Sequence, residues 1–250
     1  MQYPIERVYD TPVDILTMDD IIRDMSTHFN QQKKMTLASI NPQIILMADS
    51  NPQVKAFIES ASHRFADGIG VVKVSRWTKG QITERIAGID VMVETLKYAN
   101  QFHKKIFLYG AKPEVVEKAA AAIQKDYPHL EVAGYIDGYT TQANDEIVAH
   151  INQSGADMLF VALGSPKQEE WLNNFMPQLN CTVFQTVGGS LDVLSGTVRR
   201  APEFFIKTNL EWVYRSFSHP SRLYRILQVP EFVGKSLAWH RKIKSDIKES

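Results

Sequence analysis

A six-residue segment in the second half of the sequence, Gly164-Ser165-Pro166-Lys167-Gln168-Glu169, combines residue types that bind anions. Its glycine lets the backbone approach a ligand closely, and a helix that begins here presents unpaired N–H groups to a negative charge. Lys167 adds a compact positive charge suited to a phosphate. The same spacing fits an ordinary capping box, with Ser165 at the N-cap and Gln168 at N3. The segment is therefore predicted to be either a phosphate site or a plain helix start.

A second candidate, Gly188-Gly189-Ser190-Leu191-Asp192, repeats this arrangement further along the chain. Two glycines permit a tight turn, and Asp192 falls in the first turn of a predicted helix. A carboxylate at that position either stabilises the helix dipole or binds the hydroxyls of a sugar or ribose. Both interpretations stay open from the spacing alone.

A third candidate is the carboxylate of Asp67, which lies in the segment Ala66-Asp67-Gly68-Ile69-Gly70. An exposed carboxylate on a flexible backbone can take a proton from a hydroxyl nucleophile, although an aspartate in a turn often only bonds its own backbone. Gly68 and Gly70 also suggest a dinucleotide loop, with Glu84 as the ribose ligand, and hence an NAD oxidoreductase. That match is weak, because Lys73 occupies the third glycine position and no clear strand precedes the loop.

Several enzyme classes leave no trace in the sequence. There is no Asp-x-Asp pair, no Gly-x-Ser-x-Gly motif and no Walker A loop, and the seven histidines lack metal-ligand spacing. These absences argue against a metal hydrolase, a serine hydrolase and a P-loop NTPase. We expect neither a metal nor a cofactor.

The candidate residues follow short apolar segments that alternate with helical patterns. The clearest predicted strands are 35–40, 106–109, 131–136, 158–163 and 182–187, and 71–74 is a weaker one. Strands separated by helical segments indicate βαβ units and a mainly parallel sheet, which binds ligands at the carboxyl ends of its strands. We therefore expect a Rossmann-like, doubly wound α/β fold.

The formal net charge of zero is unevenly distributed. Residues 1–198 contain 17 Lys and Arg and 23 Asp and Glu, whereas residues 199–250 contain 11 and 5. The basic part is rich in aromatic residues and is predicted to be helical over 202–217 and 221–248, with breaks at Pro220 and Pro230. It fits an anionic membrane surface, a nucleic acid or a packed extension with a solvated face. We divide the chain into a catalytic domain over 1–198 and a helical appendage over 199–250.

The compartment is inferred from three further observations. Cys181 is a single cysteine, so it forms no internal disulfide and suits a reducing environment, and its neighbours predict the start of a buried strand. The sequence begins with no signal-peptide pattern, and its apolar segments are shorter than the roughly 18 residues of a bilayer span. We expect a cytoplasmic protein that touches a membrane only from its surface.

Several motifs together resemble the WecG/TagA/CpsF glycosyltransferases. They occur in order between about residue 5 and residue 230. They are Asn41-Pro42, Ala66-Asp67-Gly68, Glu84-Arg85-Ile86-Ala87-Gly88-Ile89-Asp90, Phe107-Leu108-Tyr109-Gly110-Ala111, Gly164-Ser165-Pro166-Lys167-Gln168-Glu169, Gly188-Gly189 with Asp192, Arg200-Ala201-Pro202 and Leu210-Glu211-Trp212-Val213-Tyr214-Arg215.

The resemblance implies an inverting transfer from a UDP-sugar to undecaprenyl-diphosphate-linked N-acetylglucosamine at the cytoplasmic membrane face. The sequence is more similar to the branch that uses UDP-N-acetylmannosamine, in an early step of wall teichoic acid linkage-unit synthesis. UDP-N-acetylmannosamine uronic acid and UDP-glucose are the alternative donors. Other classes that stay open are the NAD oxidoreductase and a non-catalytic membrane adaptor. Self-association is expected from the family, and a nucleic-acid partner is not.

The resemblance also assigns site residues. It places the catalytic base at Asp67, and it aligns Ser39 with a family threonine whose hydroxyl the serine retains. The substrate-binding residues expected are Ser39, Asn41, Arg85, Lys167, Gln168, Gly188, Gly189 and Asp192. Three arginines match those of the family's membrane-docking appendage and are expected to contact the membrane, the leaving group or both: Arg215, Arg222 and Arg225.

The residues and the resemblance combine into one mechanistic hypothesis. Asp67 deprotonates the acceptor hydroxyl, which attacks the anomeric carbon from the face opposite UDP. Helix N-termini and arginine, rather than a metal, stabilise the leaving diphosphate.

Overall fold

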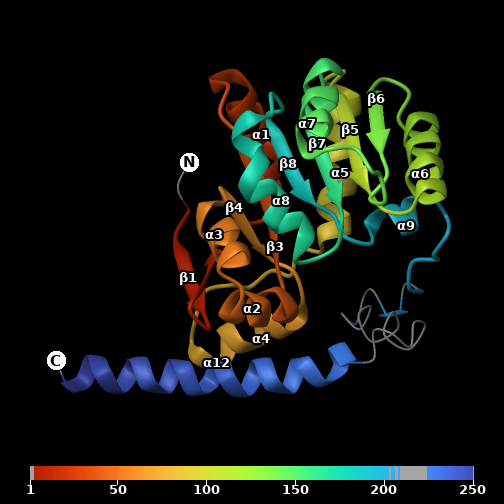
Figure 1. Cartoon of the computed structure of the whole chain (residues 1–250). Helices are drawn as coiled ribbons and strands as arrows, with labels where there is room; N and C mark the ends of the chain where they lie inside the picture. The colour runs from red at the N-terminus through yellow and green to blue at the C-terminus, as the bar shows by residue number, and fades with distance from the viewer. Residues whose placement is uncertain (1–2, 203, 206–207, 209–223, 250) are drawn as a thin grey trace.

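A six-stranded parallel sheet lies at the centre of the molecule (Figure 1). The computed structural model describes residues 3–202, 204–205, 208 and 224–249. The strand order is β4-β3-β8-β7-β5-β6. The strand bounds are β3 (Met35–Ile40), β4 (His63–Ala66), β5 (Lys105–Gly110), β6 (Glu131–Ile136), β7 (Met158–Ala162) and β8 (Val183–Thr186).

Helices cover both faces of this sheet. They are α1 (Met18–Gln31), α2 (Pro42–Ser50), α3 (Pro52–Ser60), α4 (Ile69–Thr78), α5 (Gly88–Gln101), α6 (Pro113–Asp126), α7 (Asn144–Gln153), α8 (Lys167–Phe175) and α9 (Ser190–Leu194), with a 3-10 turn at Met176–Gln178. One apolar cluster includes Phe57 and Trp171 from α3 and α8, and a second includes Met25 and Leu96 from α1 and α5. Burial on both faces explains why the central strands read as continuous apolar segments. The predicted doubly wound α/β fold is confirmed.

The five clear strand predictions are confirmed to within a residue or two, but the strand predicted at 71–74 is wrong. Those residues lie in α4, where Val71, Val72 and Val74 are buried while Lys73 and Arg76 are exposed. That spacing is the period of a helix with one buried face. The β-branched valines, which favour strands, are held in the helix by this burial.

The apolar pattern did not predict β4 or an N-terminal hairpin, which consists of β1 (Ile5–Val8) and β2 (Thr11–Asp14). In β4, polar residues occupy two of the four positions. Arg64 donates from Nη2 to Asp14 Oδ1 over 2.7 Å, and its backbone N–H donates to Asp14 Oδ2 over 2.7 Å. This pairing fastens the hairpin to the edge of the sheet.

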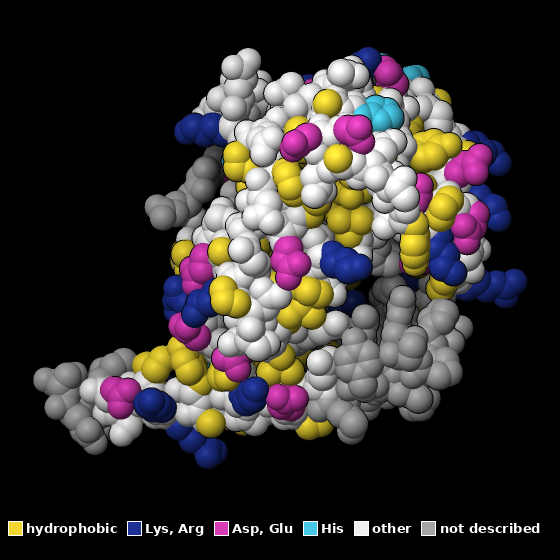
Figure 2. All heavy atoms as spheres, viewed as in Figure 1, with side chains coloured by type: hydrophobic (Ala, Val, Ile, Leu, Met, Phe, Trp, Pro, Cys, Tyr) yellow, Lys and Arg dark blue, Asp and Glu magenta, His cyan; other side chains and the backbone are white. Residues whose placement is uncertain are grey.

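The C-terminal helix α12 (Tyr224–Glu249) packs along α2 and α4. Phe232 and Ser236 are fully buried, and Lys235 Nζ lies 3.5 Å from Asp49 Oδ2 of α2. Figure 2 shows hydrophobic side chains along the boundary between α12 and the body, with charged side chains on the helix's visible outer face. The appendage therefore contains a helix that is part of the folded body.

The predicted helix break at Pro230 is wrong, because α12 continues through this residue. A proline removes one backbone hydrogen bond and usually bends a helix. Here the packing of the following turns on α2 and α4 offsets that loss. The predicted break at Pro220, and the predicted helix over 202–217 apart from residues 202, 204–205 and 208, lie outside the described residues. No helix in the described part of the chain has the length and apolar composition to cross a bilayer.

Candidate active site

A cavity of about 990 Å³ lies at the carboxyl ends of the parallel strands. Its walls come from the segments after all six strands and from Gln228, Val229 and Val233 of α12. The predicted site residues that line it are Ser39, Asn41, Asp67, Arg85, Lys167, Gln168, Gly188, Gly189 and Asp192. The fold thus brings together every site residue that was predicted within 1–198.

The structure does not describe the side chains of the three predicted arginines of the appendage. Arg215 and Arg222 lie outside the described residues. Arg225 belongs to the first turn of α12, but its side chain is outside the described part. Their expected contact with substrate or membrane stays a prediction.

The carboxylate of Asp67, directly after β4, accepts two hydrogen bonds on one oxygen. Ser39 Oγ, near the end of β3, donates to Asp67 Oδ2 over 2.7 Å. Gly88 N, at the start of α5, donates to the same oxygen over 3.1 Å. The Asp67 backbone N–H donates to Ile40 O over 2.8 Å, which fixes the loop against β3. Three elements therefore orient this half-buried carboxylate at the cavity wall.

Gly88 leaves just enough room for that carboxylate. A Cβ atom at this position would lie 3.2 Å from Asp67 Oδ2 and 3.6 Å from Ser39 Oγ. The fully buried Gln185 of β8 donates from Nε2 to Gly88 O over 2.9 Å. The start of α5 is thus fastened to the centre of the sheet, and it positions Asp67 in turn.

The N-termini of α4, α6 and α8 face the cavity without a side-chain cap. Their N-cap residues are Gly68, Lys112 and Pro166, and each helix contributes its N-cap or first-turn residues to the cavity lining. Unpaired N–H groups and the positive end of the helix dipole attract anions. Lys112 and Lys167 add positive charge at the same wall. The arrangement suits one or more phosphate groups.

The capping box, one of the two interpretations left open for this segment, does not form, because α8 begins at Lys167 with Pro166 as its N-cap. Ser165 Oγ instead donates to Glu169 Oε1 over 2.9 Å, and Gln168 Nε2 donates to the same oxygen over 2.8 Å. Glu169 is only 2% exposed, and burial raises the pKa of its carboxyl despite these bonds. Within the described part of the chain, Gln168 Oε1 and Glu169 Oε2 are buried and unpartnered.

Segments after the neighbouring strands β3 and β8 supply further polar and glycine residues. Asn41 is the N-cap of α2, and its Oδ1 accepts a hydrogen bond from Ile44 N over 3.0 Å. Gly188 has a φ of +48°, which favours glycine. Gly189 is the N-cap of α9, whose first turn presents Asp192 as predicted.

Other cavity residues escaped the sequence analysis. Tyr139, which is 70% exposed, lies in the turn after β6, and the same search at the end of every predicted strand would have found it. Lys73 and Trp77 were hidden because the start of α4 reads as a strand. No motif in the sequence indicates that Val229 and Val233 of α12 return to the cavity.

Two other chemistries find no support in the described residues. Among them, no three His, Cys, Asp or Glu side chains are grouped so that they could hold a metal ion. Cys181 is buried two residues before β8, and burial raises the pKa of its thiol to about 12. A thiol with that pKa is a poor nucleophile near neutral pH.

The chain is similar to known proteins over most of its length. A model of the glycosyl transferase WecG/TagA/CpsF family matches residues 6–246. An N-acetylglucosaminyldiphosphoundecaprenol N-acetyl-beta-D-mannosaminyltransferase of Bacillus spizizenii is 39% identical over 216 residues, which are 86% of this chain and 84% of the relative. Proteins of the same name from Staphylococcus aureus and Bacillus subtilis are 38% identical over 248 residues (96% and 97%) and 37% identical over 228 residues (91% and 89%).

Proposed function

Because this chain belongs to the WecG/TagA/CpsF family of glycosyltransferases, we propose that it transfers N-acetylmannosamine from UDP to undecaprenyl-diphosphate-linked N-acetylglucosamine. The relatives carry that sugar and that acceptor in their names. The observation that carries the proposal is the carboxylate of Asp67, held by Ser39 and Gly88 at the wall of a cavity ringed by helix N-termini. The family and the site fit a glycosyl transfer to a hydroxyl.

Asp67 is the proposed general base. Two hydrogen bonds on Oδ2 fix the plane of its carboxyl group, so that the carboxylate can accept the proton of the acceptor hydroxyl in a defined direction. The resulting oxygen nucleophile forms a bond to the anomeric carbon while the bond to the UDP oxygen breaks on the opposite face. The anomeric configuration is inverted, and UDP leaves as an anion.

Backbone and side-chain donors stabilise the leaving diphosphate in this proposal. The uncapped starts of α4, α6 and α8, with Lys167 and Arg85, line the same cavity. Such preorganised donors favour the charge that develops on the departing group. Asn41, Gln168, Gly188, Gly189 and Asp192 complete the proposed donor and acceptor subsites.

The lipid-linked acceptor also suggests where the enzyme works. We assign the basic appendage of 199–250, including Arg215, Arg222 and Arg225, to contact with the inner membrane surface or with the leaving group. The catalytic part is assigned to 1–198, with the appendage helix α12 completing the cavity wall. UDP as carrier of the sugar, the cytoplasmic face and self-association belong to the same proposal.

Asp67→Asn tests the assignment of the base. The variant keeps the size of the side chain and loses its ability to accept a proton, so turnover should fall by about 10²- to 10⁴-fold. UDP binding, measured by calorimetry, should stay within about twofold, since the proposed diphosphate donors are unchanged. The matched control is Asp145→Asn, on the exposed first turn of α7. Turnover near the wild-type rate in Asp67→Asn would exclude the base.

A donor panel tests the sugar. UDP-N-acetylmannosamine, its uronic acid and UDP-glucose are each offered with a short-chain lipid-diphosphate-N-acetylglucosamine acceptor. The proposal expects the first donor to give the highest kcat/KM, in the presence and absence of EDTA. Preference for another donor would contradict the proposed sugar while leaving the family unchanged.

A further inference from the structure

A second basic surface lies on the catalytic body itself, on the exposed side of α4. Lys73, Arg76 and Trp77 are exposed there, and Lys79 follows as the C-cap residue. The Trp77 side chain is 57% exposed, although an indole of this size usually buries most of its surface. No acidic residue occurs between Ile69 and Gly80. We call Lys73, Arg76, Trp77 and Lys79 the α4 surface.

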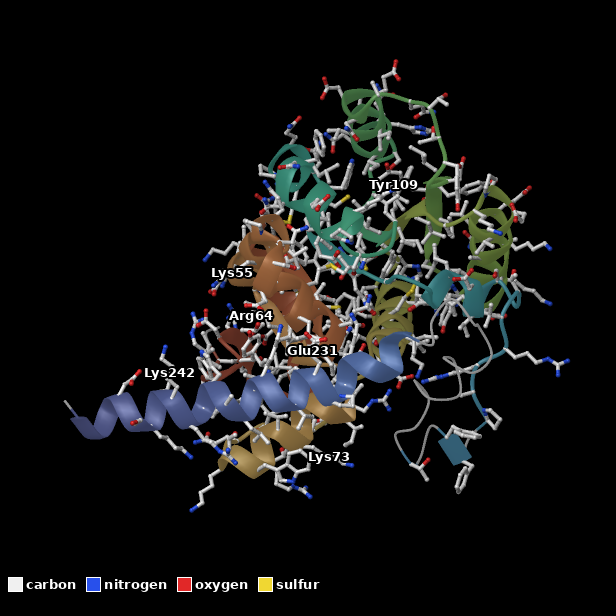
Figure 3. The ribbon with its side chains drawn as sticks, turned by 60° about the horizontal axis from the view of Figure 1, so that its bottom comes forward. Lys55, Arg64, Lys73, Tyr109, Glu231 and Lys242 are labelled. Atoms are coloured by element: carbon white, nitrogen blue, oxygen red, sulfur yellow. The ribbon has the colours of Figure 1, made fainter. Side chains whose placement is uncertain are left out.

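The α4 surface lies next to the appendage helix. Figures 1 and 3 show α4 and α12 side by side at one end of the molecule, and the two helices are in contact. Three exposed cations of α12 follow its contact with the body, at Arg241, Lys242 and Lys244. The same end of the protein therefore presents cations from two segments that are far apart in the sequence.

The α4 surface also reaches the substrate cavity. Lys73 and Trp77 line that cavity, whereas Arg76 and Lys79 lie outside its lining. The cavity therefore extends from Asp67 to the edge of the α4 surface. A substrate seated at Asp67 has a path to the protein surface beside the indole of Trp77.

We propose that the α4 surface rests on the anionic membrane and that Trp77 enters the interface where the lipid of the acceptor arrives. The inference rests on the proposed function, because only a lipid-linked acceptor must keep its tail in the bilayer while its sugar reaches Asp67. Indoles favour the headgroup region, where the ring is partly apolar and its N–H stays hydrated. Cations attract anionic lipids over about a Debye length. The body thus contributes its own membrane contact beside that of the appendage.

The double variant Arg76→Glu/Lys79→Glu tests whether the cations of the α4 surface attract anionic lipids. Neither residue lines the cavity, so the substitutions leave the cavity lining unchanged. Binding to vesicles of phosphatidylglycerol and phosphatidylcholine (1:1) should weaken by about tenfold or more, at roughly 1 kcal/mol for each cation. Turnover of a water-soluble acceptor should stay unchanged, whereas turnover of an acceptor embedded in the vesicles should fall. The matched control is Lys118→Glu/Lys125→Glu, on the exposed side of α6. Equal vesicle binding by the test and control variants would overturn the proposal.

Trp77→Phe tests insertion of the indole. Vesicles that contain brominated lipid should quench part of the wild-type tryptophan emission, and this variant should lose a measurable share of that quenching. Tyr135→Phe, at an exposed site on β6, is the control, and the brominated lipid should quench its tryptophan emission as much as that of the wild type. Unchanged quenching in Trp77→Phe would exclude Trp77 from the membrane. If the wild type turned over no UDP-sugar with the soluble acceptor, the proposed function would fail, whereas vesicle binding and quenching would still report on the α4 surface.

Discussion

At the residue scale, Ser39 stands where the family resemblance predicts a threonine. Serine and threonine share a hydroxyl, and here the Ser39 hydroxyl donates to Asp67 Oδ2 over 2.7 Å. The missing methyl group does not take part in that bond. The hydroxyl at this position therefore acts on the carboxylate, and we assign Ser39 to positioning Asp67 in the proposed reaction.

Gly88→Ala is the sharpest residue-scale test of this positioning. Its Cβ would lie 3.2 Å from Asp67 Oδ2, so the carboxylate must move by a few tenths of an ångström. Because misplacing a reacting group by 1 Å costs about 10²-fold, this smaller shift should lower kcat by roughly 3- to 10-fold with little change in KM. Steady-state kinetics, with circular dichroism to verify folding, measures this.

Gly234→Ala provides the control for that substitution. Gly234 lies in α12, and a Cβ added there would meet no atom within 4 Å. Its activity should match the wild type, and its stability should rise slightly because alanine favours the helix. A Gly88→Ala enzyme with the wild-type kcat would show that the position of Asp67 tolerates this displacement.

At the scale of elements, α12 depends on one buried aromatic residue. Phe232 is fully buried, and one of its ring atoms would lie 3.7 Å from a Cβ added at Gly70 of α4, where Pro42 of α2 is also close. Three helices therefore meet at this ring. The cavity residues Val229 and Val233 flank it on the same helix.

Phe232→Ala should loosen α12 from the body. Removing a buried phenylalanine side chain costs about 3–5 kcal/mol, and here the loss falls on the docking of one helix. Trypsin should then cleave within α12 at lower protease concentration, and turnover should fall even with a soluble acceptor. Ala238→Ser, on the exposed face of α12, is the control. A proteolysis pattern identical to that of the control would mean that other contacts hold the helix.

Elements whose sequence pattern reflects their own burial could be predicted. Elements that depend on contacts with distant residues could not. The strand at 158–163 was predictable because it is buried on both faces and therefore apolar throughout. β4 was not, since its Arg64 pairs with the carboxylate of Asp14, fifty positions away. The continuation of α12 past Pro230 likewise depends on packing against α2 and α4.

The site residues divide in a similar way. The glycines after β8 could be found because they follow a predicted strand, and Asp67 because glycines flank it. The family resemblance added Ser39 and Arg85. All of these line the cavity. The contributions of Trp77 and Val233 could not be found, because they depend on which faces of α4 and α12 the tertiary packing turns toward the cavity.

At the scale of the whole molecule, the net charge of zero is the sum of two segments of opposite charge. The first 198 residues are acidic and the remainder is basic. The two parts are not separate bodies in space, because α12 lies against α2 and α4 and Lys235 of α12 lies beside Asp49 of α2. The basic appendage therefore forms part of the cavity wall, in addition to its proposed membrane contact.

Deleting residues 199–250 should therefore impair catalysis as well as vesicle binding. The truncated chain loses Gln228, Val229 and Val233 from the cavity wall and exposes the apolar surface beneath Phe232. We expect turnover of a water-soluble acceptor to drop by about tenfold or more, because an open site admits water around the reacting groups. Wild-type turnover of that acceptor by the truncated chain would instead show that the appendage acts only at the membrane.

The docking of α12 also bears on the order in which the cavity is built during synthesis. All six strands and Asp67 precede α12 in the sequence, so a ribosome completes the sheet before it makes the helix that closes the cavity. A nascent chain can fold around its sheet and still lack part of the cavity wall. The cavity wall is then complete only after α12 has been made and has docked on α2 and α4.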